Sequence, residues 1–150
     1  SVIIYSFSMA VIFIYKSKIL KPALIADEVH LENTAVITTL IVSDANNKKI
    51  VIPINDVMYF SANSPYINIH LESKKYLQKR TLKYLEGQLN STQFLRVHKS
   101  CIINMHKVIS YKSRLNGDYD ITLSDNTQLR LSRNYLKAFK SAMEGNHGVT

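Results

Sequence analysis

The sequence predicts a mainly β domain of packed antiparallel sheets with two short helices, preceded by an apolar N-terminal helix. From residue 35 onward the apolar residues recur mostly at every second position, which is the period of a strand. Clusters of Asn, Asp, Ser and Gly interrupt these runs at short intervals, as they do between antiparallel strands. Only two stretches of this part of the chain have the helical period.

The N-terminal segment differs from the rest. Residues 1–15 are mostly apolar and carry no charge, and three lysines follow at once. Fifteen helical residues span about 22 Å, less than the roughly 30 Å core of a bilayer. We therefore expect residues 1–20 to be part of a transmembrane helix that begins upstream of Ser1, with the lysines on the cytoplasmic side. The alternative is a buried core helix or strand. Residues 21–39 are expected to form a linker.

The first half of the domain reads as two hairpins. The polar cluster Asp44–Asn47 separates two apolar runs, which is typical of a hairpin turn. The clean alternation of Tyr66–Leu71 predicts a strand with one apolar face. The small polar run Ser61–Pro65 predicts a turn between it and the preceding strand, Val57–Phe60.

The second half alternates helices with short strands. Leucines at helical spacing predict a helix over Thr81–Leu89 with Thr81 as its N-cap. A second helix is predicted over Arg133–Met143, capped by Ser132 and stopped by Gly145. Asn116 and Gly117 are the preferred residues of a two-residue hairpin turn. The strands predicted between the helices are Phe94–Val97, Ile102–Ile103, Val108–Tyr111, Asp118–Leu123 and Gln128–Leu131.

Composition and charge limit the function classes. The 150 residues are 46% hydrophobic, which is enough for a core and excludes wholesale disorder. One cysteine excludes an internal disulfide framework. Residues 74–140 hold fourteen Lys and Arg against four Asp and Glu, whereas residues 1–73 carry a net charge of −1. The excess of positive charge therefore lies in one half of the chain, which points to a polyanion as partner.

Catalytic motifs are weak or missing from the sequence. It has four glycines and none forms a phosphate-binding GxGxxG or GxxxxGK[ST] loop. His98 and Cys101 are three residues apart on predicted strands, where side chains at that spacing do not converge on a metal. Cys101 lies in an apolar run and is expected to be a buried thiol. We expect no enzyme activity, no metal and no cofactor.

Two basic junctions suit nucleic acid. Arg96, His98 and Lys99 surround the point where the apolar pattern of a predicted strand breaks, which predicts a loop. Arg133 and Asn134 stand between a predicted strand and the last helix. Arginine forms paired hydrogen bonds with guanine, and asparagine with adenine, so this second junction suits base readout. The alternative is a solvated basic face with a helix cap.

Five segments together resemble the LytTR-type DNA-binding domain of bacterial transcription regulators. The resemblance covers residues 40–143 and is most specific in the core F-L-R-V-H-K-S-C-I-I-N and the later S-R-N-Y. The segments are Asp56–Phe60, Tyr66–His70, Thr81–Glu86, Phe94–Asn104 and Leu129–Tyr135.

The resemblance implies an elongated β sandwich over residues 40–144, with residues 145–150 as a tail. It also implies that loops, rather than a recognition helix, enter successive major grooves, at paired direct repeats. Pro65 departs from the family at a contact position of the first loop, so Asn63 or Ser64 is expected to act there. The base contacts that this implies are Asn63, Ser64, Tyr66, His98, Lys99, Arg133 and Asn134. The phosphate contacts expected from charge and position are Lys74, Lys75, Lys79, Arg80, Lys83, Ser100, Arg114 and Lys137.

The sequence thus predicts a regulator held in the inner membrane, with its domain in the cytoplasm binding duplex DNA sequence-specifically. Further expected partners are the membrane, a second copy of the chain on DNA, and a membrane sensor protein. A rival interpretation docks the basic half on anionic lipid or protein without reading sequence. An enzyme with an unrecognised site is a third.

Overall fold

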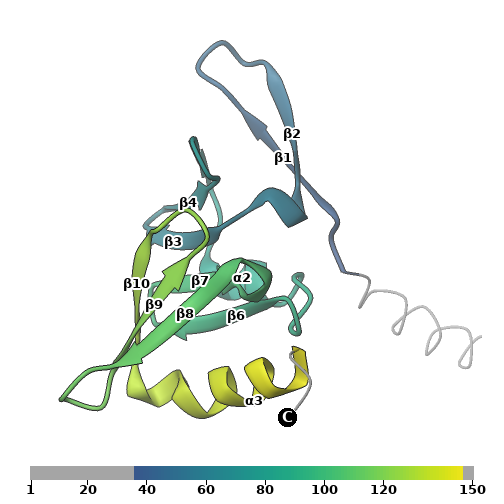
Figure 1. Ribbon diagram of the computed structural model, residues 1–150. Coiled ribbons are helices and arrows are strands. Elements are labelled where there is room, and N and C mark those ends of the chain that lie inside the picture. The colour runs from purple at the N-terminus through teal and green to yellow at the C-terminus, as the bar shows by residue number, and fades with distance from the viewer. Residues whose placement is uncertain (1–35, 147–150) are drawn as a thin grey trace, which may run out of the picture. The chain divides into compact units, whose positions relative to one another are not determined.

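A five-stranded antiparallel sheet is the central element of the computed structural model, which describes residues 36–146 (Figure 1). Its strand order is β5-β4-β3-β7-β6. The register pairs Phe60 with both Ile69 and Ile102, so these three side chains share one face. The strands are β3 (Tyr59–Asn63), β4 (Tyr66–His70), β5 (Lys75–Gln78), β6 (Phe94–His98) and β7 (Cys101–Asn104).

Two smaller antiparallel sheets accompany it. One is the hairpin of β1 (Thr39–Ser43) and β2 (Lys49–Pro53). Its turn is held by Asp44, whose Oδ1 accepts hydrogen bonds from the N–H groups of Asn46 and Lys48 at 2.8 and 2.9 Å. The other sheet has the order β10-β9-β8. Its strands are β8 (Val108–Ser113), β9 (Tyr119–Leu123) and β10 (Gln128–Leu131).

The helices are short. Helix α2 (Leu82–Glu86) begins at Thr81, whose Oγ1 accepts the N–H of Tyr84 at 3.1 Å, which confirms the predicted N-cap. Helix α3 (Leu136–Asn146) follows a single 3-10 turn, η3 (Arg133–Tyr135). Two further 3-10 turns join strands: η1 (Ile54–Asp56) and η2 (Met105–Lys107).

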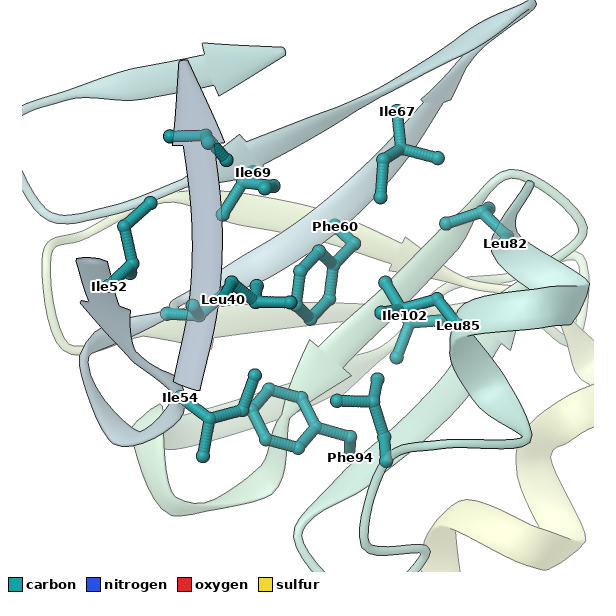
Figure 2. Close-up of a cluster of buried hydrophobic side chains, with 13 residues drawn as sticks. Leu40, Ile52, Ile54, Phe60, Ile67, Ile69, Leu82, Leu85, Phe94 and Ile102 are labelled. Atoms are coloured by element: carbon teal, nitrogen blue, oxygen red, sulfur yellow. The ribbon is translucent and has the colours of Figure 1, made fainter. Parts of the chain in front are cut away.

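Each face of the central sheet covers its own hydrophobic cluster. On one face, Phe60 and Ile102 pack with Leu85 of α2 and with Leu40 and Ile52 of the first hairpin (Figure 2). On the other face, Val97 of β6 and Ile103 of β7 pack with buried residues of the three-stranded sheet and of α3, namely Ile121, Leu131 and Phe139. The central sheet is therefore enclosed on both faces, which confirms the predicted mainly β fold of packed antiparallel sheets.

Several predicted boundaries were wrong. Strand β3 continues to Asn63, so the turn expected over Ser61–Pro65 contains only Ser64 and Pro65. Strand β5 was not predicted. Helix α2 ends at Glu86 rather than Leu89, and α3 passes through Gly145, which therefore does not stop it. Ser132 makes no side-chain hydrogen bond to the turn that it was expected to cap.

The predicted anchor over residues 1–20 and most of the predicted linker over residues 21–39 lie outside the described residues. Within residues 36–146 no helix is both long enough and apolar enough to cross a bilayer. The anchor stays a prediction.

Candidate nucleic-acid interface

The three predicted base-reading loops lie at one end of the central sheet and are joined through β6 and its loop. They are the β3–β4 turn at Ser64, the β6–β7 loop at Lys99 and the β10–η3 junction. The carbonyl of Ser100 accepts the N–H of Ala62 at 2.9 Å, which ties the second loop to the strand of the first. The N–H of Ser132 donates to the carbonyl of Val97 at 2.9 Å, which ties the third loop to β6. Main-chain bonds therefore fix the spacing of the three loops.

The first loop presents exposed polar side chains. Asn63 and Tyr66 are cross-strand partners on either side of Ser64 and Pro65, whose peptide bond is cis. All four residues are exposed, and Tyr66 has a fractional exposure of 43%. Nδ2 of Asn63 donates a long hydrogen bond of 3.4 Å to Oδ1 of Asn68. Oδ1 of Asn63 is not engaged by any described contact.

The second loop is organised by His98. The N–H of Ser100 donates to Nδ1 of His98 at 3.2 Å, so Nδ1 is an acceptor and the ring proton sits on Nε2. The hydroxyl of Ser100 lies 2.9 Å from the same nitrogen and donates to it. Lys99 stands between these two residues with its side chain exposed. His98 and Ser100 thus shape the loop, and Lys99 is its outward group.

Arg96 holds the β6–β7 loop in place through its guanidinium, a role that the sequence did not reveal. Its guanidinium donates to the carbonyl of His98 at 3.3 Å and to the carbonyl of Lys99. It also pairs with Glu86 of α2 at 3.0 Å. The register of β6 against β7 shifts between Arg96 and His98, which bends the strand into the loop. One cation therefore ties the loop to α2.

The third loop is anchored by Asp118 of the β8–β9 hairpin. Oδ1 of Asp118 accepts the N–H of Arg133 at 3.1 Å, which supplies the cap expected from Ser132. Oδ2 lies 3.3 Å from Nε of Arg130. The side chains of Arg133 and Asn134 are exposed, as predicted. Asp118 was not predicted because it lies 15 residues from the turn that it caps.

Cations gather beside the first two loops. Arg80, Lys83 and Arg96 line a surface hollow of about 270 Å³ together with Ser64, Tyr66 and Lys99. Arg80 is steadied there by Gln88, whose Oε1 accepts from its guanidinium at 3.2 Å, and by the ring of Tyr84. The hollow thus joins predicted base contacts to predicted phosphate contacts.

The other predicted phosphate contacts are more dispersed. Lys79 is exposed next to Arg80, and Lys137 is exposed at the start of α3. Arg114 lies in the β8–β9 hairpin, where it pairs with Asp120 at 3.6 Å. Lys74 and Lys75 follow the far end of β4, about 13–17 Å from the loops if that strand is fully extended. The structure does not bring these two lysines to the loops.

A polar network lies along β3 and β4, from Ser61 to the end of the strands opposite the β3–β4 turn. The rings of Tyr59 and His70 stack with centroids 3.9 Å apart, and Nε2 of His70 lies 2.9 Å from Oγ of Ser61. Asn68 donates to that same hydroxyl at 3.1 Å. Burial lowers the pKa of His70, and the charge of Lys75 lowers it further. The network therefore favours the neutral imidazole.

Metal-ligating residue types do not cluster in the described part of the chain. No group of three or more His, Cys, Asp or Glu side chains is placed to hold a metal among residues 36–146. Cys101 is buried, and burial raises the pKa of its thiol to about 12. The described site is therefore built from exposed hydrogen-bonding groups and cations.

Comparison with known proteins places this arrangement in a family. Residues 47–144 match the profile of the LytTr DNA-binding domain. The sensory transduction protein LytR of Staphylococcus haemolyticus is 28% identical over 102 residues, which are 68% of this chain and 40% of that protein. The transcriptional regulatory protein LytR of Staphylococcus aureus is 31% identical over 75 residues, or 50% of this chain and 30% of that protein.

A solved structure agrees in fold. A LytTr DNA-binding domain from Bacillus cereus superposes with a TM-score of 0.66 at 19% identity, covering 71% of this chain and 97% of that one. The chain spans less than half the length of the curated relatives that it matches. With the profile matched over most of its length, the chain belongs to the LytTr DNA-binding domain family.

Proposed function

We propose that this domain binds duplex DNA sequence-specifically, with its three loops in successive major grooves, and that it regulates transcription. The main support is the position of the exposed side chains of Tyr66, Lys99 and Arg133. They stand on three loops that main-chain bonds hold at one end of a rigid sheet. Binding DNA and regulating transcription are also what the names of the family and of its relatives state.

Each loop offers chemistry that suits base edges. The fork of Arg133 matches the O6 and N7 acceptors of guanine, and the amide of Asn134 matches adenine. Lys99 can donate to guanine or to a phosphate. His98 offers DNA only its Nε2–H, because Nδ1 is engaged by Ser100. In the first loop, Asn63, Ser64 and Tyr66 supply an amide and two hydroxyls.

Phosphate binding would come from the cations around these loops. Lys79, Arg80 and Lys83 flank the first two loops, and Lys137 flanks the third. Ser100 contributes through the loop that it shapes, and Arg114 through the neighbouring hairpin. Lys74 and Lys75 would reach phosphate only where the duplex also passes the far end of β4.

The proposal extends to the setting of the domain. Two copies would bind direct repeats, with the same loops reading each repeat. Residues 1–20 would hold the protein in the inner membrane, with the domain in the cytoplasm and a membrane sensor protein as partner. The uncharged run before three lysines supports the anchor. Recovery of the full-length protein in the soluble fraction of cells would overturn it.

Selection from random duplex DNA tests the central claim. The chain, kept in mild detergent, is expected to enrich one motif at moderate salt, repeated in the same orientation. An enriched single motif without a repeat would remove the direct-repeat element alone. Enrichment of no motif would overturn sequence-specific binding.

Two exposed cations four residues apart, Arg133 and Lys137, give a matched pair of variants. Arg133→Ala is expected to cost about 1–3 kcal/mol of binding free energy and to relax specificity at one base position. Lys137→Ala should weaken binding to all sequences alike and lower the salt slope by about one unit. Equal effects of both variants, with equal binding to anionic vesicles, would favour lipid docking instead.

A further inference from the structure

The tip of the β8–β9 hairpin carries an apolar side chain with no packing role. Leu115 has a relative exposure of 111%, the largest among the large apolar residues described. It follows Arg114 and precedes Asn116, which are both exposed. Single exposed apolar residues are common on protein surfaces, so exposure alone assigns no role. Two further features concern where this tip is held and what charge surrounds it.

The tip is attached to the third loop. Asp118 closes the turn opposite Arg114 and has 17% of its side chain exposed. Its carboxylate accepts the N–H of Arg133 and pairs with the guanidinium of Arg130. Gly117 has a φ of +88°, and a Cβ placed on it would lie 3.9 Å from Cδ of Arg133. In Figure 1 the hairpin tip extends beside the start of α3. A duplex that meets Arg133 therefore also passes this tip.

The charge around the tip is positive. Lys112, Arg114 and Arg130 line one shallow hollow with Leu115 and Asn116, and no acidic residue lines it. The two acids of the return strand face arginines, Asp118 towards Arg130 at 3.3 Å and Asp120 towards Arg114 at 3.6 Å. An apolar tip flanked by cations is complementary to a DNA groove, where an apolar side chain can press between stacked bases while the cations meet the phosphates on either side.

We propose that the tip Arg114–Asn116 enters the minor groove next to the major-groove segment that Arg133 faces. This inference rests on the proposed function. The minor groove is about 6 Å wide, so it admits one side chain of a turn but no helix or two-stranded ribbon. Leu115 presses against a base step as an apolar wedge, and Lys112 and Arg114 bind the flanking phosphates. The hairpin thereby adds a fourth contact, which responds to minor-groove shape.

The test uses the full chain on the duplex that the wild-type protein selects. Leu115→Ala is compared with Ile109→Ala, which truncates a side chain of 60% exposure near the start of β8, the strand that leads to the tip. Hydroxyl-radical footprinting is expected to show one protected minor-groove segment beside the Arg133 position. Leu115→Ala should lose that segment and bind about ten-fold more weakly. Ile109→Ala should match the wild type, and both variants should keep the wild-type Tm.

A base substitution identifies the groove. Inosine in place of guanine removes the amino group from the minor groove and leaves the major-groove pattern intact. Where a G·C pair occupies the protected segment, this substitution should change the affinity of the wild-type protein for the duplex. The affinity of Leu115→Ala should stay the same. Where the segment holds only A·T pairs, the same comparison is made with a G·C pair introduced there.

The outcomes separate the two proposals. A wild-type footprint that Leu115→Ala leaves unchanged would overturn the wedge and leave sequence-specific binding intact. Loss of transcriptional activity without loss of the footprint would assign the tip to a protein partner and overturn the wedge. The absence of any wild-type footprint would overturn the proposed function, and the wedge with it.

Discussion

Replacing Arg96 with methionine is expected to weaken DNA binding by loosening the loop that carries Lys99. Methionine keeps much of the apolar stem and removes every hydrogen bond of the guanidinium. The variant would lose the bonds to the carbonyls of His98 and Lys99 and the ion pair with Glu86. The loop would then sample conformations in which Lys99 does not face the same side as Arg133.

The magnitude follows from the environment of these bonds. A hydrogen bond from a charged donor contributes about 1.5–3 kcal/mol when buried. The Arg96 side chain is 22% exposed, and one of its bonds is long at 3.3 Å, so we expect about 1–2 kcal/mol in total. If binding requires the ordered loop, its apparent dissociation constant should rise about five- to thirty-fold.

Titration of the selected duplex by fluorescence anisotropy measures this change, with denaturant unfolding as a check on the fold. Glu86→Gln is the matched control, because it removes the ion pair and leaves both carbonyl bonds. A half-exposed ion pair contributes only about 0–1 kcal/mol, so Glu86→Gln should bind nearly as the wild type does. Arg96→Lys keeps the charge but lacks the planar fork with which Arg96 bonds the two carbonyls and Glu86 together, and should bind DNA weakly. Full binding by Arg96→Lys would show that charge alone matters and would refute the loop argument.

Three further predictions concern the scaffold. Asn104 is fully buried between the carbonyl of Val57 and the N–H of His106, so Asn104→Ala should lower the free energy of unfolding by about 2–4 kcal/mol in urea titrations. Cys101, with a thiol pKa of about 12, should resist iodoacetamide at pH 8 until the protein unfolds; rapid native alkylation would contradict its burial. His70 has a lowered pKa in the fold, so the unfolded chain binds the proton more tightly. The contribution of His70 to stability should be present above its ordinary pKa of 6.5 and fall as the pH drops below it. Between pH 8 and pH 5, the Tm of His70→Gln should therefore fall less steeply than that of the wild type.

Local chemistry was enough to predict where two hairpins turn and where one helix starts. The two-residue turn expected at Asn116 and Gly117 is wrong, however, because the connection between β8 and β9 spans residues 114–118. The Asp44 carboxylate closes its turn through two neighbouring N–H groups, and Gly117 adopts the positive φ that a tight turn requires. Thr81 caps α2 from three residues away. All these interactions lie within a few residues of each other, so the sequence displays both partners together.

Strand β5 was not predicted, because each of its faces carries both a polar and an apolar residue. Lys75 and Leu77 are exposed, whereas Tyr76 and Gln78 are half-buried. Each face thus combines a polar with an apolar residue, and no period of two is visible. The strand is formed by pairing with β4, which no local pattern reports.

Part of the candidate site could also be predicted from the sequence and part could not. The positions of Lys99 and Arg133 in loops followed from breaks in the apolar pattern, and both are exposed as expected. Their contacts with bases stay predictions. The supports of these loops were not predicted. Asp118 acts on a turn 15 residues away, and the bonds of Arg96 to the carbonyls of His98 and Lys99 depend on the bulge that bends β6 between Arg96 and His98.

The main-chain hydrogen bonds that Ala62 donates to Ser100 and that Ser132 donates to Val97 bear on how the proposed recognition could be altered. Neither bond uses a side chain, so neither depends on which residues occupy the loop tips. A combinatorial library at Ser64, Lys99 and Arg133 would therefore vary the exposed groups while the spacing between them is conserved. If these loops read bases as proposed, the distance between the contact points is set by the main chain and their chemistry by the exposed side chains, so substitutions at the loop tips should change the recognised sequence without changing the spacing.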